Sequence, residues 1–297
     1  MTPHLFHVDA FTKELFRGNS AGVVLHADDL TEEQMQLIAR ELRHSETAFV
    51  LKSEESDLRI RYFTPSAEVP ICGHATVSVH YVRAKMLGLK SCTLYQSSLA
   101  GRHRVDIDYK NDDYIITLEQ GVPSFEPPLE GDVRSRIIRA LGLNEDNILT
   151  GLPVQIVSTG HSKVMIPLNP DVSVDNINPD LAALAVISGE IGCNGFFVFT
   201  IRPGTCETDG RMFAPAIGIA EDPVTGNANG PMGAWIVRYG LMPHDGKTLR
   251  IKGHQGRAVG RSGTVHVTVN IKDNQPQKVS ISGEAVILFD APLPLLR

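Results

Sequence analysis

Side chains of the kinds that move protons stand at a few positions of this 297-residue chain, chiefly Glu46, Cys72, His74 and Asp222. A carboxylate can remove a proton from an activated C–H bond and return it to another carbon when a partly buried setting raises its pKa. Backbone N–H groups at a helix end can meanwhile stabilise the enolate-like charge that forms. A fold that gathers such groups could therefore catalyse proton transfer without a cofactor.

The stretch from Gly218 to Trp235, G-I-A-E-D-P-V-T-G-N-A-N-G-P-M-G-A-W, predicts a sharp loop that runs into a buried helix. This loop delivers Gly226 and Asn227 to the helix N-terminus. Free N–H groups and the positive end of the helix dipole meet there and favour an anionic ligand or a developing oxyanion. Asp222 lies four residues before Gly226, close enough to place a carboxylate beside that anion site.

The first half of the chain contains a second copy of this motif. Residues 61–76 read R-Y-F-T-P-S-A-E-V-P-I-C-G-H-A-T, and residues 211–228 read R-M-F-A-P-A-I-G-I-A-E-D-P-V-T-G-N-A. The matched pairs are Arg61 with Arg211, Phe63 with Phe213, Pro65 with Pro215 and, after a three-residue slip, Pro70 with Pro223, Gly73 with Gly226 and Ala75 with Ala228. Fainter matches keep the same order upstream, G-N-S at 18–20 with G-H-S at 160–162 and the residues from 41 with those from 190. Collinear pieces of this kind indicate two homologous halves.

Composition is that of a soluble globular protein, with 42% hydrophobic and 21% charged residues. The apolar runs are all shorter than the roughly 18 residues that a membrane span needs. The N-terminus lacks the pattern of a secretion signal, so we expect a cytoplasmic location and no membrane partner. A net charge of −6 without basic clusters argues against nucleic acid. The four cysteines have no zinc-ligand spacing, so we expect free thiols and no metal.

Hydrophobic periodicity predicts short strands mixed with a few helices. In the first half we expect strands at 5–10, 21–25, 48–51, 58–63, 93–96, 105–109 and 114–118, and helices at 32–43 and from 75 to 87. Thr31 and Gln34 have the spacing of a capping box, and Asn111-Asp112-Asp113 that of a hairpin turn. In the second half we expect helices at 132–141, 179–188 and from about 230, and strands at 153–158, 163–167, 195–201, 249–252, 264–271 and 279–289.

This order of elements predicts an α+β protein with two similar domains that face one another across a cleft. Proline and acidic residues at 123–131 indicate a linker. We therefore place the domains at 1–122 and 123–297, with a last strand, about 281–289, that returns to the first half. Glu46, His74, Asp222 and Asn227 are expected to point into the cleft.

Three segments resemble the PhzF-like isomerase family, which is named for a phenazine-biosynthesis enzyme and is related in fold to diaminopimelate epimerase. They are S-E-T-A-F at 45–49, the F-T-P…P-I-C-G-H segment, and the M-F-A-P…E-D-P-V-T-G-N segment. The resemblance extends from V-D-A-F near the N-terminus to beyond Trp235. It implies two pseudo-symmetric, β-barrel-like halves, each around a central helix, with the active site in the cleft between them. It also implies a homodimer and a proton transfer that uses no cofactor.

The resemblance also assigns roles by position. Glu46 takes the place of the general acid/base, His74 and Asp222 those of polar groups that orient the substrate and assist proton movement, and Gly73 and Gly226 those of backbone anion holders. The remaining residues expected to contact a small anionic metabolite are Asn19, Ser20, Cys72, His161, Thr225 and Asn227.

Two positions depart from the related enzymes. Diaminopimelate epimerase has a cysteine in each half, whereas here Cys72 fills the first position and Thr225 the second. The phenazine enzyme has a small apolar residue in place of Cys72 and a serine in place of Asn227, so the substrate stays open. Three hypotheses follow: an isomerase that moves a proton within a small carboxylate, an amino-acid racemase or epimerase that uses Cys72, and a binding protein that has lost catalysis.

Overall fold

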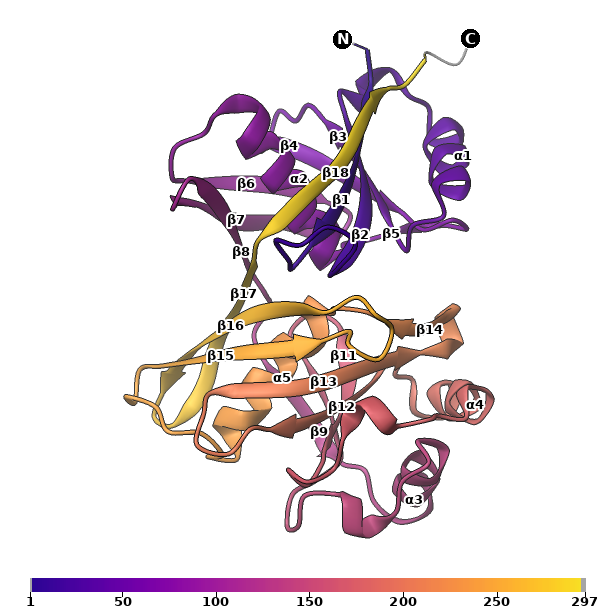
Figure 1. The fold of residues 1–297 in the computed structure, drawn as a ribbon, viewed down its shortest axis with the longest axis vertical. Coiled ribbons are helices and arrows are strands. Elements are labelled where there is room, and N and C mark those ends of the chain that lie inside the picture. Colours follow the sequence, from indigo (N-terminus) through magenta and orange to yellow (C-terminus); the bar gives the residue numbers. More distant parts are fainter. Residues whose placement is uncertain (1, 295–297) are drawn as a thin grey trace. The chain divides into compact units, whose positions relative to one another are not determined.

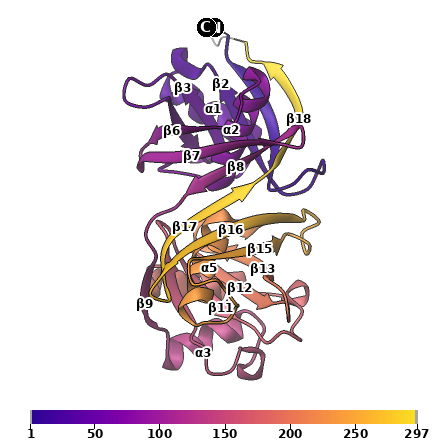
Figure 2. The same ribbon diagram turned by 90° about the vertical axis from the view of Figure 1, so that its left-hand side faces the viewer.

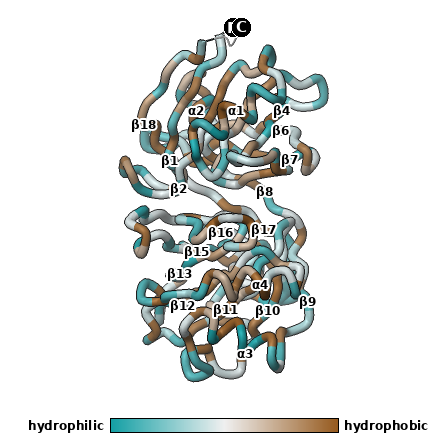
Figure 3. Tube along the Cα trace, turned by 90° about the vertical axis from the view of Figure 1, so that its right-hand side faces the viewer, coloured by the Kyte–Doolittle hydropathy of each residue, from teal (hydrophilic) through white to brown (hydrophobic). Residues whose placement is uncertain are grey.

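The computed structural model describes residues 2–294. These residues divide into two compact units, residues 2–119 with 282–294 and residues 120–281. Hydrophobic and hydrophilic segments are interspersed along the chain in Figure 3. Among residues 2–294, no helix combines the length and the apolar character that crossing a membrane requires.

The first unit is a sheet around one central helix, α2 (Figure 1). Its strands are β1 (His4–Ala10), β2 (Asn19–Leu25), β3 (Thr47–Leu51), β4 (Leu58–Phe63), β5 (Glu68–Val69), β6 (Cys92–Ser98), β7 (Gly101–Lys110), β8 (Asp113–Glu119) and β18 (Ala285–Pro292). Strand β1 is antiparallel to β2 and β18, β2 is parallel to β3, and β4 is antiparallel to β3 and parallel to β6. Figure 2 shows β6, β7 and β8 side by side in an antiparallel ribbon.

Helix α2 (Gly73–Leu87) is largely enclosed, with ten of its fifteen residues buried. It packs against β1, β2, β3 and β8. Polar residues on it bond back to its own first turn, since Thr76 Oγ1 donates to the Cys72 carbonyl at 2.7 Å and Ser78 Oγ to the His74 carbonyl at 2.9 Å. A helix of this kind has a fixed place in the core, so its first turn is held rigidly.

The predicted capping box and hairpin turn of this unit are confirmed. Thr31 caps α1 (Glu32–Leu42), with its hydroxyl accepting from the Gln34 N–H and the Gln34 side chain accepting from the Thr31 N–H. Asn111 and Asp112 both have positive φ, 54° and 60°. That backbone matches the twist of the flanking strands β7 and β8.

The second unit repeats this scheme. Its elements are β9 (Ser124–Pro128), α3 (Gly131–Ala140), β10 (Gln155–Ser158), β11 (Ser162–Pro167), α4 (Leu181–Ile191), β12 (Phe196–Ile201), β13 (Glu207–Ala214), β14 (Ile219–Asp222), α5 (Gly226–Arg238), β15 (Thr248–Gln255), β16 (Gly263–Lys272) and β17 (Gln275–Gly283), with short 3-10 helices at 145–147, 174–176 and 215–217. Strand β11 is parallel to β12, β12 is antiparallel to β13, and β13 is parallel to β15, as β2, β3, β4 and β6 are in the first unit. Helix α5 is the buried counterpart of α2.

The repeat extends to side-chain contacts. Arg61 on β4 pairs with Glu68 on β5 at 2.6 Å, and Arg211 on β13 pairs with Glu221 on β14 at 2.7 Å. Each guanidinium also covers the phenylalanine two residues later, at 5.0 Å for Phe63 and 4.9 Å for Phe213. The two halves therefore share one architecture.

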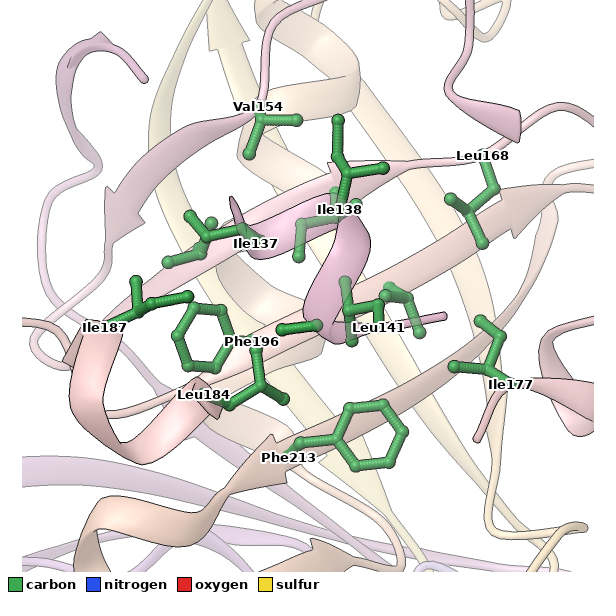
Figure 4. Packing of buried hydrophobic residues seen from close by; sticks show 14 of the residues in the cluster. Ile137, Ile138, Leu141, Val154, Leu168, Ile177, Leu184, Ile187, Phe196 and Phe213 are labelled. Atoms are coloured by element: carbon green, nitrogen blue, oxygen red, sulfur yellow. The ribbon is translucent and has the colours of Figure 1, made fainter. Parts of the chain in front are cut away.

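Helices α3 and α4 cover a second apolar core in this unit. Ile137, Ile138 and Leu141 pack against Phe196 and Phe213, as Figure 4 shows. This core also contains Val164 and Ile166 of β11, so it holds strands β11 to β13 against the two helices.

Three expected elements differ from the structure. The expected linker at 123–131 contains β9, which pairs antiparallel with β10 despite its prolines. The helix expected from about residue 230 begins at Gly226, and the loop before it contains β14. The strand expected at 279–289 is two strands, β17 and β18, that are separated at Glu284.

Candidate active site

His74 lies in the first turn of α2, and its ring is almost wholly buried. Asn19 Nδ2 lies 3.3 Å from its Nδ1, and Ser45 Oγ lies 3.3 Å from its Nε2. The Cys72 Sγ lies 3.4 Å from Nδ1. These contacts fix the ring plane, so the imidazole has one orientation.

Glu46 completes this cluster. Its Oε2 lies 3.4 Å from His74 Nε2, and its side chain is 15% exposed. The parallel pairing of β2 with β3 positions it, since the Gly22 N–H donates to the Glu46 carbonyl at 3.3 Å just before β3 begins. Oε2 is fully buried, and no group in residues 2–294 forms a hydrogen bond with it. A buried carboxylate oxygen without a donor is costly, so the site is suited to a ligand that fills this need.

Cys72, His74 and Glu46 also form a possible set of metal ligands. One ligand atom from each lies within 4.8 Å of the others. Thiolate, imidazole and carboxylate are all ligands that zinc accepts. The expectation that the protein needs no metal stays a prediction.

The second unit has its own polar cluster where β14 meets α5. Thr225 Oγ1 donates to Asp222 Oδ2. Gln255 Nε2 donates to the Asp222 carbonyl at 2.8 Å, while Gln255 Oε1 accepts from the Thr225 N–H at 3.0 Å. Asn229 Nδ2 donates to the same Oε1 at 3.0 Å. This network, which the sequence analysis did not include beyond Asp222 and Thr225, holds the loop before α5 in one conformation.

Both central helices begin without a side-chain cap. Within residues 2–294, neither Cys72 before α2 nor Thr225 before α5 forms a capping hydrogen bond. The first N–H groups of a helix have no intrahelical partner. Those of Gly73 and Gly226, the expected anion holders, therefore remain suited to an anion.

Lys163 is a functional candidate that the sequence analysis missed. It is 8% exposed on β11, and its Nζ donates to the Ser162 carbonyl at 3.0 Å. Burial lowers its pKa, which the attraction of Cys193 and Asp222 partly opposes. The glycine at 195 makes room for the stem, because a Cβ there would lie 2.3 Å from Lys163 Cδ. The signal was in the repeat, where G-H-S-K at 160–163 matches G-N-S-A at 18–21.

The expected site residues thus fall into two groups. Asn19, Glu46, Cys72 and His74 are in contact in the first unit, together with Ser45, which the sequence analysis did not select. In the second unit Asp222, Thr225 and Gly226 are adjacent. His161 lies in the same unit, and its pKa is lowered mainly by burial and further by the positive charge of Lys163. Of the others, Ser20 pairs with Asp9 across β2 and β1, and Asn227 is half-buried in the first turn of α5.

Comparisons with known proteins define the class, an isomerase with the epimerase-like architecture. A family model described as phenazine biosynthesis-like protein, PhzC-PhzF, matches residues 8–291, and the chain belongs to this family. It is 71% identical over 291 residues to the uncharacterized isomerase YddE of Salmonella typhimurium, with 98% of each chain covered. It is also 30% identical over 287 residues to the trans-2,3-dihydro-3-hydroxyanthranilate isomerase of Pseudomonas chlororaphis, with 95% of this chain and 96% of that protein covered.

Solved structures support the same family and fold. A PhzF-family phenazine biosynthesis protein of Bacillus anthracis superposes with a TM-score of 0.88 at 31% identity, covering 99% of this chain and 100% of that one. A probable proline racemase of Agrobacterium radiobacter shares the fold alone, with a TM-score of 0.68 at 11% identity, covering 99% of this chain and 94% of that one. The predicted family, fold class and enzyme class are therefore confirmed.

Proposed function

We propose that this isomerase moves a proton within a small carboxylate-bearing metabolite, with Glu46 as the general acid/base and without a cofactor. The observation that carries the proposal is the buried Oε2 of Glu46, 3.4 Å from His74 Nε2 and without a hydrogen-bond partner in residues 2–294. A carboxylate in such a setting is ready to accept a proton from a bound molecule.

The proposed reaction needs only groups that this chain supplies. Glu46 takes a proton from an activated carbon, and the electron pair left behind is delocalised toward the substrate's unsaturated bonds. His74 stabilises this charge by hydrogen bonding, as do the first N–H groups of α2. Protonated Glu46 then delivers the proton to a second carbon, which shifts a double bond and leaves the enzyme unchanged. Asp222 and the start of α5 are proposed to orient the substrate.

A second candidate is racemisation or epimerisation through Cys72. It is favoured by the 3.4 Å distance between the Cys72 Sγ and His74 Nδ1, because a neighbouring imidazole can accept the thiol proton. Thr225 argues against this candidate. It stands at the position of the second half that matches Cys72, so no second thiol is present there for the other face of the substrate. We therefore place the carboxylate mechanism first.

The first compound to test is trans-2,3-dihydro-3-hydroxyanthranilate, after which one relative is named. A wider panel of small carboxylates and amino acids should be tested beside it. Glu46→Gln should lower turnover of whichever compound reacts by roughly 10²- to 10⁴-fold, with ligand binding kept. Glu41→Gln, an exposed change nearby on α1, is the matched control and should have no effect. Turnover of Glu46→Gln within a few-fold of wild type would remove Glu46 from the mechanism.

Assembly and location also belong to the proposal. We propose a cytoplasmic homodimer, in keeping with the composition and with the family resemblance. Sedimentation of the purified protein measures the assembly directly, and a monomer at micromolar concentration would contradict this part.

A further inference from the structure

A cavity of about 520 Å³ lies in the first unit at the end of α2 that is remote from His74. Small-molecule sites usually have volumes of roughly 300–1,000 Å³. Its walls come from the last turn of α2, the last residues of β2 and β3, and the first residues of β1 and β4. The cavity is therefore built from regular elements that the core already holds.

This cavity is distinct from the candidate active site. Asn19 begins β2 and Leu25 ends it, so the active-site cluster and the cavity use opposite ends of the same strand. In the same way His74 lies in the first turn of α2, while Leu87 is its last residue. A helix of fifteen residues is about 22 Å long, too long for one small ligand to reach both ends.

Arg83 lines the cavity and has a hydrogen-bond donor that is not used. Its Nη1 is fully buried, and no acceptor for it is present in residues 2–294. Burial lowers the pKa of Arg83, and the attraction of Asp57 opposes this shift. A guanidinium in this condition gains from an acceptor oxygen, most of all a charged one.

The other charged groups of the cavity are already partly used. Asp28 Oδ1 accepts from the Lys52 N–H at 2.8 Å, and Asp57 Oδ2 accepts from the Tyr95 N–H at 2.7 Å. The Lys52 ammonium adds a second positive charge to the wall. Arg83 thus remains the donor with the greatest need of a partner.

Apolar side chains make the rest of the cavity. Leu25, Val50 and Leu58 are buried beneath it. Met86 and Leu87 border it and expose 60% and 61% of their surface, which is unusual for large apolar residues on a core helix. A ligand with an apolar body would cover both.

We propose that this cavity binds a small amphipathic anion, a carboxylate or a phosphate monoester, whose oxygen accepts from Arg83 and whose apolar body packs against Met86 and Leu87. The proposal concerns a second ligand site and does not depend on the isomerase mechanism.

Octanoate, octyl phosphate and octanol test this site with one tail and three head groups. In protein labelled with ¹³C at the methionine methyl groups, the Met86 resonance, assigned with Met86→Leu, should shift on titration with octanoate or octyl phosphate. The resonance of Met35, buried in the core of the same unit, should not. Octanol, which lacks the charge, should bind roughly tenfold to a hundredfold more weakly than the better of the two anions. Which anion binds more tightly identifies the head group.

Arg83→Gln should remove the advantage of the anions over octanol. Arg102→Gln, at an exposed arginine that stacks on Tyr95 at 4.0 Å, is the matched control and should leave all affinities unchanged. An unshifted Met86 resonance, or equal affinity of wild-type protein for octanol and the anions, would overturn the proposal. The comparison of octanol with the two anions uses only wild-type protein, so it tests the proposal even if Arg83→Gln does not fold.

Discussion

The Nε2 of His74 and the Oε2 of Glu46 lie 3.4 Å apart at the N-terminal end of the central helix of the first unit. Asn19 and Ser45 fix the imidazole from either side of its ring. The carboxylate oxygen has no hydrogen bond from residues 2–294, which suits it to the role of proton acceptor that we propose.

Cys72→Ala should reduce turnover far less than Glu46→Gln does. The thiol is buried against His74, and its loss removes packing and one contact to the ring, whereas Glu46→Gln removes the proposed proton acceptor. Steady-state kinetics of both variants beside thermal unfolding separates the two effects. An inactive Cys72→Ala with an unchanged melting temperature, and stoichiometric inactivation of wild type by iodoacetamide, would favour the thiol epimerase instead.

His80 should make the protein less stable in acid. Burial lowers its pKa from 6.5 to about 4. The unfolded chain therefore binds a proton in a range where the folded protein does not, and stability that is complete above pH 6.5 is lost as the pH falls toward 4. The loss should be about 3 kcal/mol.

Urea unfolding between pH 7 and pH 4 measures this dependence. His80→Gln, which can still donate to Gln96, should make the profile flatter. His26→Asn is the control, because that histidine is exposed and asparagine tolerates its positive φ of 58°. A wild-type profile unchanged by His80→Gln would show that other groups cause the acid sensitivity.

Arg211→Met should destabilise the protein more than Arg61→Met, its counterpart in the repeat. Arg211 is bidentate to Glu221 and also donates to the carbonyls of Val174 and Ile177 at 3.0 and 2.6 Å. Removing it leaves a buried carboxylate unpaired, at a cost of about 3–5 kcal/mol. Arg61 is more exposed, so its loss should cost less. Denaturant unfolding of both variants checks this, and equal losses would contradict it.

Much of the fold could be predicted because local rules and the repeat agree. The capping box at Thr31 and the hairpin turn at Asn111 depend on short-range chemistry, and the repeat placed Gly73 and Gly226 at matching helix starts. The assignment failed where tertiary pairing overrides local preference. β9 contains two prolines and reads as a linker, yet β10 provides the partner that makes it a strand.

The candidate site could be predicted only in part. Glu46, Cys72 and His74 come together because β3 begins beside the start of α2, an arrangement that the family resemblance implied. Gln255 and Asn229 were missed for a physical reason. Gln255 bonds to the loop before α5 and to Asn229 from a segment far along the chain, and such contacts have no signature in residue spacing. Lys163 stands in the repeat, but its burial, which makes it a candidate, is visible only in the structure.

The central claim is that one carboxylate both removes and returns the proton. Wild-type enzyme is given specifically deuterated substrate in H₂O, and the product is analysed by NMR. Because Glu46 is largely shielded from solvent, return of the label should compete with exchange. We predict a shifted double bond, with a measurable part of the deuterium on the second carbon. An inverted stereocentre with no bond migration and complete loss of the label would contradict the single-carboxylate mechanism.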